Sequence, residues 1–337
     1  MFIVRTIKEA DIDALVALSV KPNMAGITSL PTSRKKLQEK IAAAKDAIAH
    51  FCIGKNQKYL FVLEDLETTS IVGCCGIHSQ VGSFNKWCYK IIDEPLSQLS
   101  PQTSATTRVL VPSAYENPAT EICSLFIMPE LRHKGMGKLL SFSRLLYIGT
   151  FPERFQEMII AEMRGPITAN GISSVWQAIG EKIFNVSFLT ITAYLKERID
   201  VMSSLILKHP IYLSLLPEEI QKTIGTVHEQ TQPALQMLLD QGFSLIDRID
   251  PVDGGPWIEA KRDDIKAIKA CSLGTISNIT DENLGPNMGI LCNNSVDFRA
   301  CLGSWTINHQ GITITRDVAF ALKLQIGDKV AFSCCLQ

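Results

Sequence analysis

Hydrophobic and polar residues in the N-terminal part of the chain form short alternating runs, and between these runs apolar residues recur with helical spacing. Apolar positions three and four apart indicate an amphipathic helix, whereas short alternating or continuous apolar runs between turn residues indicate strands. On this basis we expect strands at residues 2–6, 59–65 and 70–78, and helices at 9–19 and 33–51. The polar residues 66–69 separate two of these strands, which predicts an antiparallel hairpin.

The next part of the pattern predicts a strand, a loop and a helix in direct succession. An apolar run from Cys123 to Met128 ends at Pro129, a basic stretch with two glycines follows, and helical spacing begins at Leu139. Two further strand-like segments, at 86–92 and 107–111, lie before this run. We interpret them as an insertion ahead of the strand–loop–helix segment.

A weak internal repeat follows. Each copy is expected to contain a strand, a loop, a helix and a second strand led by an aromatic residue. The predicted elements are a strand at 157–164, a helix at 173–183 and a strand from Phe184 in the first copy, then a strand at 223–228, a helix at 232–240 and a strand from Phe243 in the second. Residues 185–222 between the copies have mostly helical spacing. The repeat indicates a partial duplication of one fold.

The C-terminal part has a different pattern, in which short apolar segments alternate with Gly and Asn turns. Closely spaced short strands are typical of a small β-barrel. Strands are expected at 272–276, 289–292, 298–303, 312–315 and 330–334, with one helix at 316–322. The sequence therefore predicts an α+β protein of three parts, residues 1–184, 185–256 and 257–337, of which the last is a small β-barrel-like module.

Composition narrows the class of protein. The 337 residues exceed a single minimal domain, and 46% apolar against 20% charged residues fits a large core. A net charge of −1 favours neither a nucleic-acid partner nor an anionic membrane surface. The apolar runs are too short to span a bilayer, and the N-terminus lacks a signal-peptide layout. The ten cysteines are scattered without a C-x-x-C pair, which predicts free thiols in a reducing cytoplasm and no metal site.

The segment from Arg132 to Gly137 has the chemistry of an anion site. Amides in the first turn of a helix have no internal partner and lie at the positive end of the helix dipole. Gly135 and Gly137, on either side of Met136, let backbone amides approach a phosphate, and Arg132 and Lys134 add positive charge. A plain structural turn would have a similar composition, and the spacing matches neither a P-loop nor a dinucleotide-binding loop.

The spacing R-x-x-G-x-G, preceded by L-F-I-x-P-E-L-R, resembles the pyrophosphate loop of the GNAT N-acyltransferases. The resemblance implies a GNAT-like fold in which this loop binds the pyrophosphate of an acyl-coenzyme A, beside a strand whose backbone N–H faces the thioester carbonyl. Acylation of an amine by a thioester requires an acceptor for the amine proton, donors for the developing oxyanion, and a proton or positive partner for the departing thiolate. The backbone at Leu125 is the candidate oxyanion donor.

Among the six histidines, His228 has the most suitable position for proton transfer. It is expected to end a strand and to open a loop that leads into a helix, a place where ligands meet α/β folds. Its unperturbed pKa near neutrality suits the task. A histidine hydrogen-bonded to its own loop would explain the position equally well. The other five are expected in surface, capping, turn or loop roles: His50, His78, His133, His209 and His309.

Three charged residues are candidates for binding a small substrate. Glu162 suits a cationic group and Arg164 suits a carboxylate, because a guanidinium binds carboxylates with two parallel hydrogen bonds. An ordinary ion pair between strands would explain both equally well. Asp253, in Asp-Gly-Gly-Pro, would meet a cation or form the turn that its glycines favour.

Several unusual segments together make a second resemblance specific. They are residues 26–31, 59–65, 125–126, 161–165, 208–212, 224–234 and 253–256. In combination they resemble the arginine N-succinyltransferase family over essentially the whole chain. The resemblance implies a cytoplasmic acyltransferase of the EC 2.3.1 class that transfers a succinyl group from succinyl-CoA to the α-amino group of L-arginine, giving N2-succinyl-L-arginine and CoA. It also implies a homo-oligomer, or a hetero-oligomer with a paralogous subunit.

Carried over position by position, this resemblance places the family's active-site histidine, treated as a proton donor, on His228 and its succinyl-CoA contact on Leu125. One imidazole can both accept the proton of the amine and donate to the leaving thiolate, so His228 is expected to act as general acid/base. The chain departs from the family in two places. It has N-M-A-G-I-T-S-L-P at residues 23–31 where the family often has G-G-G-L-T-S-L-P, and it has Glu229 where the family often has proline. An acceptor such as ornithine or another basic amino acid, and a subunit that binds acyl-CoA without catalysis, therefore stay open as alternatives.

Overall fold

The computed structural model describes residues 1–19, 30–52, 55–83, 86–95, 106–132, 134–197, 202–285 and 287–334. The chain divides into two compact units. Unit 1 comprises Met1–Gln80, Thr120–Ile159 and Ala260–Gln337, and unit 2 comprises Val81–Ala119 and Ile160–Glu259. This division follows contacts in space, whereas the boundaries expected at residues 184 and 256 follow chain order and stay predictions.

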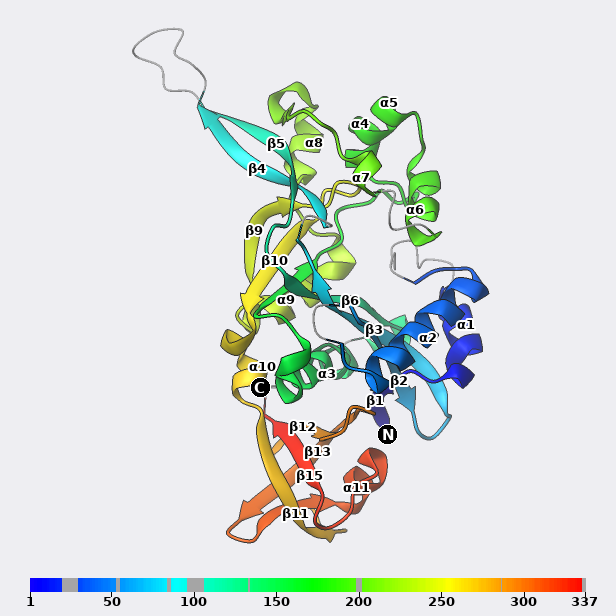
Figure 1. Ribbon diagram of the computed structural model, residues 1–337, viewed down its shortest axis with the longest axis vertical. Helices are drawn as coiled ribbons and strands as arrows, with labels where there is room; N and C mark the ends of the chain where they lie inside the picture. The colour runs from blue at the N-terminus through cyan, green and yellow to red at the C-terminus, as the bar shows by residue number, and fades with distance from the viewer. Residues whose placement is uncertain are drawn as a thin grey trace. The chain divides into compact units, whose positions relative to one another are not determined.

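The first part of unit 1 is a β-sheet with helices on both faces (Figure 1). Alternate residues of a strand face opposite sides of the sheet. Leu60 and Val62 therefore pack with helices α1 and α2 on one face, while the ring of Phe61 lies 5.1 Å from that of Tyr147 in α3 on the other face. The elements are strands β1 (Phe2–Thr6), β2 (Lys58–Asp65), β3 (Ser70–Val81) and β6 (Ala119–Ile127) and helices α1 (Ile12–Ser19), α2 (Arg34–Ala49) and α3 (Met136–Thr150).

The predicted order of these elements is confirmed. The helix expected at 9–19 starts with a 3-10 turn, Glu9–Asp11, that leads into α1. β2 and β3 pair antiparallel around the turn at 66–69, as the hairpin pattern predicts. The strand expected from Cys123 begins earlier, at Ala119, because its first residues are also buried.

The C-terminal part of unit 1 is a small closed barrel, which confirms the predicted module. Its strands follow the order β12-β15-β11-β14-β13, and a further pairing between β12 and β13 closes the ring. Ile276, Leu291, Trp305 and Val330 fill its core. The elements are β11 (Ser272–Thr280), β12 (Met288–Asn293), β13 (Arg299–Asn308), β14 (Gly311–Thr315), α11 (Arg316–Leu322) and β15 (Lys329–Ser333), preceded by the short helix α10 (Lys266–Lys269).

Unit 2 has strands in the order β7-β10-β9-β4-β5-β8 and several short helices. The insertion predicted before β6 is the long antiparallel hairpin of β4 and β5. The strands are β4 (Trp87–Pro95), β5 (Thr106–Ala114), β7 (Met158–Glu162), β8 (Ile211–Tyr212), β9 (Ser244–Ile249) and β10 (Pro256–Lys261). The helices are α4 (Ser174–Ala178), α5 (Gly180–Phe184), α6 (Phe188–Glu197), α7 (Met202–Leu205), α8 (Glu218–Thr223) and α9 (Gln232–Asp240).

Three predictions in unit 2 are wrong. The single helix expected at 173–183 is broken at Ile179, whose φ of −119° and ψ of −71° depart from helical geometry, into α4 and α5. Phe184 ends α5 and does not lead a strand. The strand expected at 223–228 is the end of α8 followed by a turn at Gly225, which has a φ of +77°. Ile224 is buried in the core beside Tyr89 and Ile249, so its apolar character reflects packing of the turn.

Among the described residues, none of the helices has the length and apolar content that a membrane span requires.

Candidate active site

In unit 1, the glycine-containing loop runs directly into helix α3. Gly135 is the N-cap residue, with a φ of +79° and a ψ of −11°, a left-handed conformation that glycine adopts without steric cost. Its carbonyl accepts the first helical hydrogen bond, from Leu139 N, at 3.1 Å. Met136 and Gly137 then start α3, and their amides belong to the group of first-turn donors that have no partner inside the helix.

The two glycines have open space where a side chain would project. A Cβ atom built on Gly135 or Gly137 would meet no atom within 4 Å. Lys134 is exposed and Arg132 half-buried, so both cationic side chains lie at the surface beside the helix start. Open amides, a helix dipole and two cations fit a diphosphate. The structure therefore brings Arg132, Lys134, Gly135, Met136 and Gly137 together, as the sequence predicts.

Strand β6, which carries Leu125, is irregular at the preceding residue. Ser124 has a φ of +55°, which is rare for a residue with a side chain. Cys123, before this point, faces the α2 side of the sheet beside Gly76, and Phe126 packs in the α1–α2 core as well. A regular strand would send residues 123 and 126 to opposite faces. One extra residue is thus inserted at Ser124, as in a β-bulge.

Polar side chains surround the bulge on its α2 side. Lys40 of α2 donates to Ser124 Oγ at 3.4 Å, and His78 Nδ1 lies 3.3 Å from Glu121 Oε2. Burial alone would lower the pKa of His78, but the neighbouring Cys123 thiol and Glu121 carboxylate raise it to about 9. The prediction that His78 ends a strand and has a surface or capping role is wrong, because β3 continues to Val81 and the His78 side chain is only 20% exposed.

Arg144 of α3 supports the bulge from the opposite face. The side chain is fully buried, and Nη1 donates to the carbonyl of Cys123 at 3.1 Å. Nε donates to the carbonyl of Ser141 at 3.3 Å and Nη2 to its hydroxyl at 3.0 Å. The thiol of Cys74 donates to the next carbonyl, that of Ser124, at 3.6 Å. Two consecutive carbonyls of the irregular strand are therefore held by side chains, which fixes the orientation of the Leu125 amide that follows.

In unit 2, the candidate residues come from three segments that lie close together through their backbones. His228 N donates to the carbonyl of Arg164 at 2.9 Å, and Gly225 N to that of Gly254 at 2.9 Å. A Cβ atom on Gly165 would lie 2.1 Å from the carbonyl oxygen of Asp253, and one on Gly255 would lie 2.0 Å from that of Met163. Glycine is therefore required at both positions for the segments to approach. The structure thus brings together Glu162, Arg164, His228 and Asp253.

The ring of His228 is fixed by the backbone. Its Nδ1 accepts a hydrogen bond from Gln230 N at 3.1 Å. A nitrogen that accepts carries no proton, so the proton of the neutral ring lies on Nε2. Burial and the nearby Arg164 guanidinium lower the pKa of His228, against a smaller raising effect of Glu229. His228 is thus a neutral imidazole at neutral pH, with Nε2–H as its donor.

The three charged candidates have different surroundings. Glu162 Oε1 lies 2.9 Å from Nζ of Lys86, the residue before β4, and forms an ion pair with it. Burial lowers the pKa of Arg164, and Asp253 opposes that effect. Asp253 Oδ1 accepts from Gly255 N at 2.9 Å, which confirms its predicted role in the turn. Burial and the Asp253 carboxylate raise the pKa of the neighbouring Asp250 to about 7.

The sequence analysis missed Lys40, Arg144 and Asp250. Lys40 and Arg144 are cations on helical faces that otherwise bury apolar residues, which is a detectable signal. Residues 26–31, one of the segments that carry the family resemblance, lie largely outside the described residues, as does His133. Among the described residues, no group of three or more His, Cys, Asp or Glu side chains has a metal-binding arrangement.

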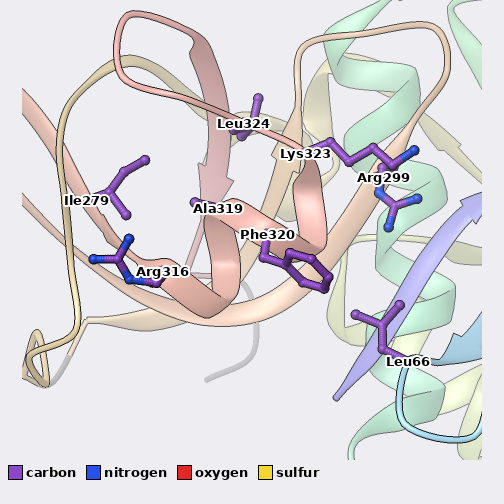
Figure 2. A pocket seen from close by; sticks show the side chains of 8 residues that line it. All are labelled: Leu66, Ile279, Arg299, Arg316, Ala319, Phe320, Lys323 and Leu324. Atoms are coloured by element: carbon purple, nitrogen blue, oxygen red, sulfur yellow. The ribbon is translucent and has the colours of Figure 1, made fainter.

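Unit 1 also contains a cavity of about 480 Å³ between α11 and the turn at Leu66. Figure 2 shows the side chains of Phe320 and Arg299 on the side toward Leu66, and those of Ile279 and Arg316 farther from it. None of the predicted site residues lines this cavity.

The fold, the open glycine loop at the start of α3 and the bulged strand before it match the GNAT-like N-acyltransferase fold that the sequence predicts. Comparisons with known proteins give the family. Residues 2–267 match the model of the arginine N-succinyltransferase beta subunit, and residues 273–333 match the model of its C-terminal domain. The chain belongs to the arginine N-succinyltransferase family.

Individual relatives agree with this assignment. The chain is 34% identical to an arginine N-succinyltransferase of Citrobacter koseri, over 98% of this chain and 96% of the relative. It is 32% identical to one of Escherichia coli, with the same coverage. Among solved structures, subunit AI of the arginine/ornithine succinyltransferase of Pseudomonas aeruginosa matches with a TM-score of 0.88 and 25% identity over 99% of both chains.

Proposed function

We propose that this enzyme transfers the succinyl group of succinyl-CoA to the α-amino group of L-arginine, giving N2-succinyl-L-arginine and CoA. The observation that carries the proposal is the family match over nearly the whole chain, combined with the open space beside Gly135 and Gly137 at the start of α3. In this proposal Arg132, Lys134, Gly135, Met136 and Gly137 bind the pyrophosphate, and the Leu125 amide polarises the thioester carbonyl.

The reaction needs no covalent intermediate with an enzyme side chain. The neutral amine attacks the thioester carbon, a C–N bond forms and the C–S bond breaks. One proton leaves the amine nitrogen and one reaches the departing sulfur, so that CoA leaves as a thiol. Fixed amide donors stabilise the oxyanion between these steps.

We assign His228 as the general acid/base: the neutral ring takes up the proton of the attacking amine, and the imidazolium so formed passes a proton to the departing sulfur. The hydrogen bond from Gln230 N to Nδ1 leaves Nε2 as the nitrogen available for this transfer. Uptake at Nε2 requires the tautomer with its proton on Nδ1, in which that hydrogen bond is lost. Because the pKa of His228 is lowered, its imidazolium is a stronger acid than an ordinary histidine and suits donation to the thiolate.

For the acceptor, we propose that Arg164 binds the α-carboxylate and that Asp253 and Glu162 interact with the cationic side chain. Arg164 suits a carboxylate because its guanidinium offers two parallel donors. Asp253 and Asp250 form an acidic pair in which burial raises both pKa values, to about 6 and about 7. A bound cation would stabilise their charged forms.

Ornithine is the second candidate acceptor. The structural relative from Pseudomonas aeruginosa is named an arginine/ornithine succinyltransferase, and ornithine differs from arginine in its cationic end group. The names of that relative and of the family model contain the word subunit, which supports assembly with a second copy or a paralogous chain.

The experiment is a thiol-release assay with succinyl-CoA and a panel of amines: L-arginine, L-ornithine, L-lysine and agmatine. We expect turnover with arginine, and none with agmatine, which lacks the carboxylate. Turnover with ornithine alone would make ornithine the acceptor in place of arginine. No turnover with any amine, by the chain alone or with its partner, would reject it. Light scattering gives the oligomeric state.

A further inference from the structure

Lys40 lies at an unusual place for a lysine. Helix α2 buries Leu37, Ile41, Ala44 and Ala47, and Lys40 is one turn from the first of these, next to the apolar stripe. Its side chain is half-buried and its Nζ contacts the hydroxyl of Ser124 at the bulge of β6. Burial lowers the pKa of Lys40. Holding an ammonium in such a place costs free energy, which is offset when the charge binds an anion.

The side chains around this ammonium carry more positive than negative charge. His78 and Lys58, which are opposite each other in the β2–β3 ladder, join Lys40 on the cationic side, whereas Glu121 is the carboxylate near them. Cys123 contributes a thiol; burial raises its pKa, but His78 and Lys40 lower it overall. An anionic group from a ligand would complement the charge of this cluster, which we call the Lys40 cluster (Lys40, Lys58, His78, Glu121, Cys123).

The Lys40 cluster is also next to the residue proposed to bind the thioester. Leu125 directly follows Ser124, whose hydroxyl contacts both Lys40 Nζ at 3.4 Å and Cys123 Sγ at 3.5 Å. The bulge at Ser124 directs the side chains of both Cys123 and Ser124 toward α2, as their closeness to Gly76 indicates. A group near the Leu125 amide is thus a short distance from a cationic site.

We propose that Lys40, assisted by His78, binds the terminal carboxylate of a dicarboxylic acyl group and thereby selects succinyl-CoA over acetyl-CoA. The inference rests on the proposed function, because it takes the Leu125 amide as the donor to the thioester carbonyl. In a succinyl group two methylenes separate the thioester carbon from the carboxylate, which matches a cationic site at the adjoining residue. An acetyl group has no carboxylate and makes no use of Lys40.

The test is Lys40→Met, which keeps the length of the side chain and removes its charge. We expect kcat/KM for succinyl-CoA to fall by about 10–100-fold, the value of one charge-assisted hydrogen bond, while kcat/KM for acetyl-CoA changes by less than about threefold. Lys40→Arg is expected to retain most of the preference for succinyl-CoA. The matched control is Lys35→Met on the exposed side of the same helix, which should alter neither donor.

Binding separates this inference from the proposed function. If the wild-type protein turns over no amine, the proposed function fails, but calorimetry still compares its affinities for succinyl-CoA and acetyl-CoA with those of Lys40→Met. The inference is overturned if the wild-type protein does not distinguish the two thioesters. It is also overturned if Lys40→Met weakens both by the same factor, because that result assigns Lys40 a structural role at the bulge.

Discussion

The two groups of candidate residues differ in how the chain builds them. In unit 1, the proposed acyl-donor site follows one continuous segment, from β6 through the glycine loop to the start of α3. In unit 2, residues of three segments, 162–165, 225–228 and 250–255, are joined by backbone hydrogen bonds and glycine contacts. A continuous segment can be recognised from local pattern, whereas a site assembled from distant segments depends on packing. Some of the glycines show the same difference: Gly135 and Gly137 of the loop face open space, whereas Gly165 and Gly255 of unit 2 face backbone.

The largest expected effect is on turnover. His228→Ala should lower kcat by ~10²–10⁴, the usual range for a group that transfers a proton in the transition state, with little change in CoA affinity. Stopped assays of kcat and calorimetry with CoA measure the two quantities. His209→Ala, at an exposed turn, is the control. A His228→Ala variant with normal kcat would remove the ring from the mechanism.

The second effect is on stability and separates the two kinds of glycine. Gly165→Ala places a Cβ atom 2.1 Å from the Asp253 carbonyl oxygen, and such overpacking costs about 1–3 kcal/mol or more. Gly137→Ala meets nothing and lies in a helix, where alanine is favoured by up to about 1 kcal/mol. Denaturant unfolding measures both. Equal stability of the two variants would show that the segments of unit 2 do not require the close approach.

The third effect is on affinity for the donor. Gly137→Val adds a side chain in the open space before the first-turn amides, so we expect a weaker affinity for CoA by about tenfold, or ~1.4 kcal/mol. The unfolding free energy should change far less. A pantetheine thioester without phosphate groups has no pyrophosphate, so the variant and the wild type should bind it with equal affinity. Unequal affinities would argue against a pyrophosphate at this loop.

The smallest effect is on pH dependence. The pKa of His228 is lowered, so the folded protein binds a proton there less readily than the unfolded chain. This group therefore destabilises the fold as pH falls below about 6.5, the ordinary histidine value. The neutral ring is the form that takes up the amine proton, so kcat/KM should decrease as pH falls through the lowered pKa of the folded enzyme, more steeply in the wild-type enzyme than in His228→Gln. Parallel profiles would contradict the assignment.

Local pattern sufficed for most of unit 1 and for less of unit 2. The hairpin of β2 and β3, the loop before α3 and the barrel strands follow from alternation and turn residues, because those elements bury regular faces. The strand expected at 223–228 was wrong because Ile224 is buried by a turn, a tertiary effect without periodicity. Position alone made His228 a candidate with an equally good alternative, a hydrogen bond to its own loop, and the resemblance favoured the catalytic role. Lys40 and Arg144 require knowledge of which helix covers which face of β6.

Because a main-chain amide donates the hydrogen bond that holds the imidazole, few substitutions at position 230 can disturb the ring. Any amino acid except proline supplies an N–H at position 230, so exchanges of that side chain leave the ring where it is. Homologues can therefore diverge around the imidazole and still inherit its pose, while a proline at 230 would abolish it.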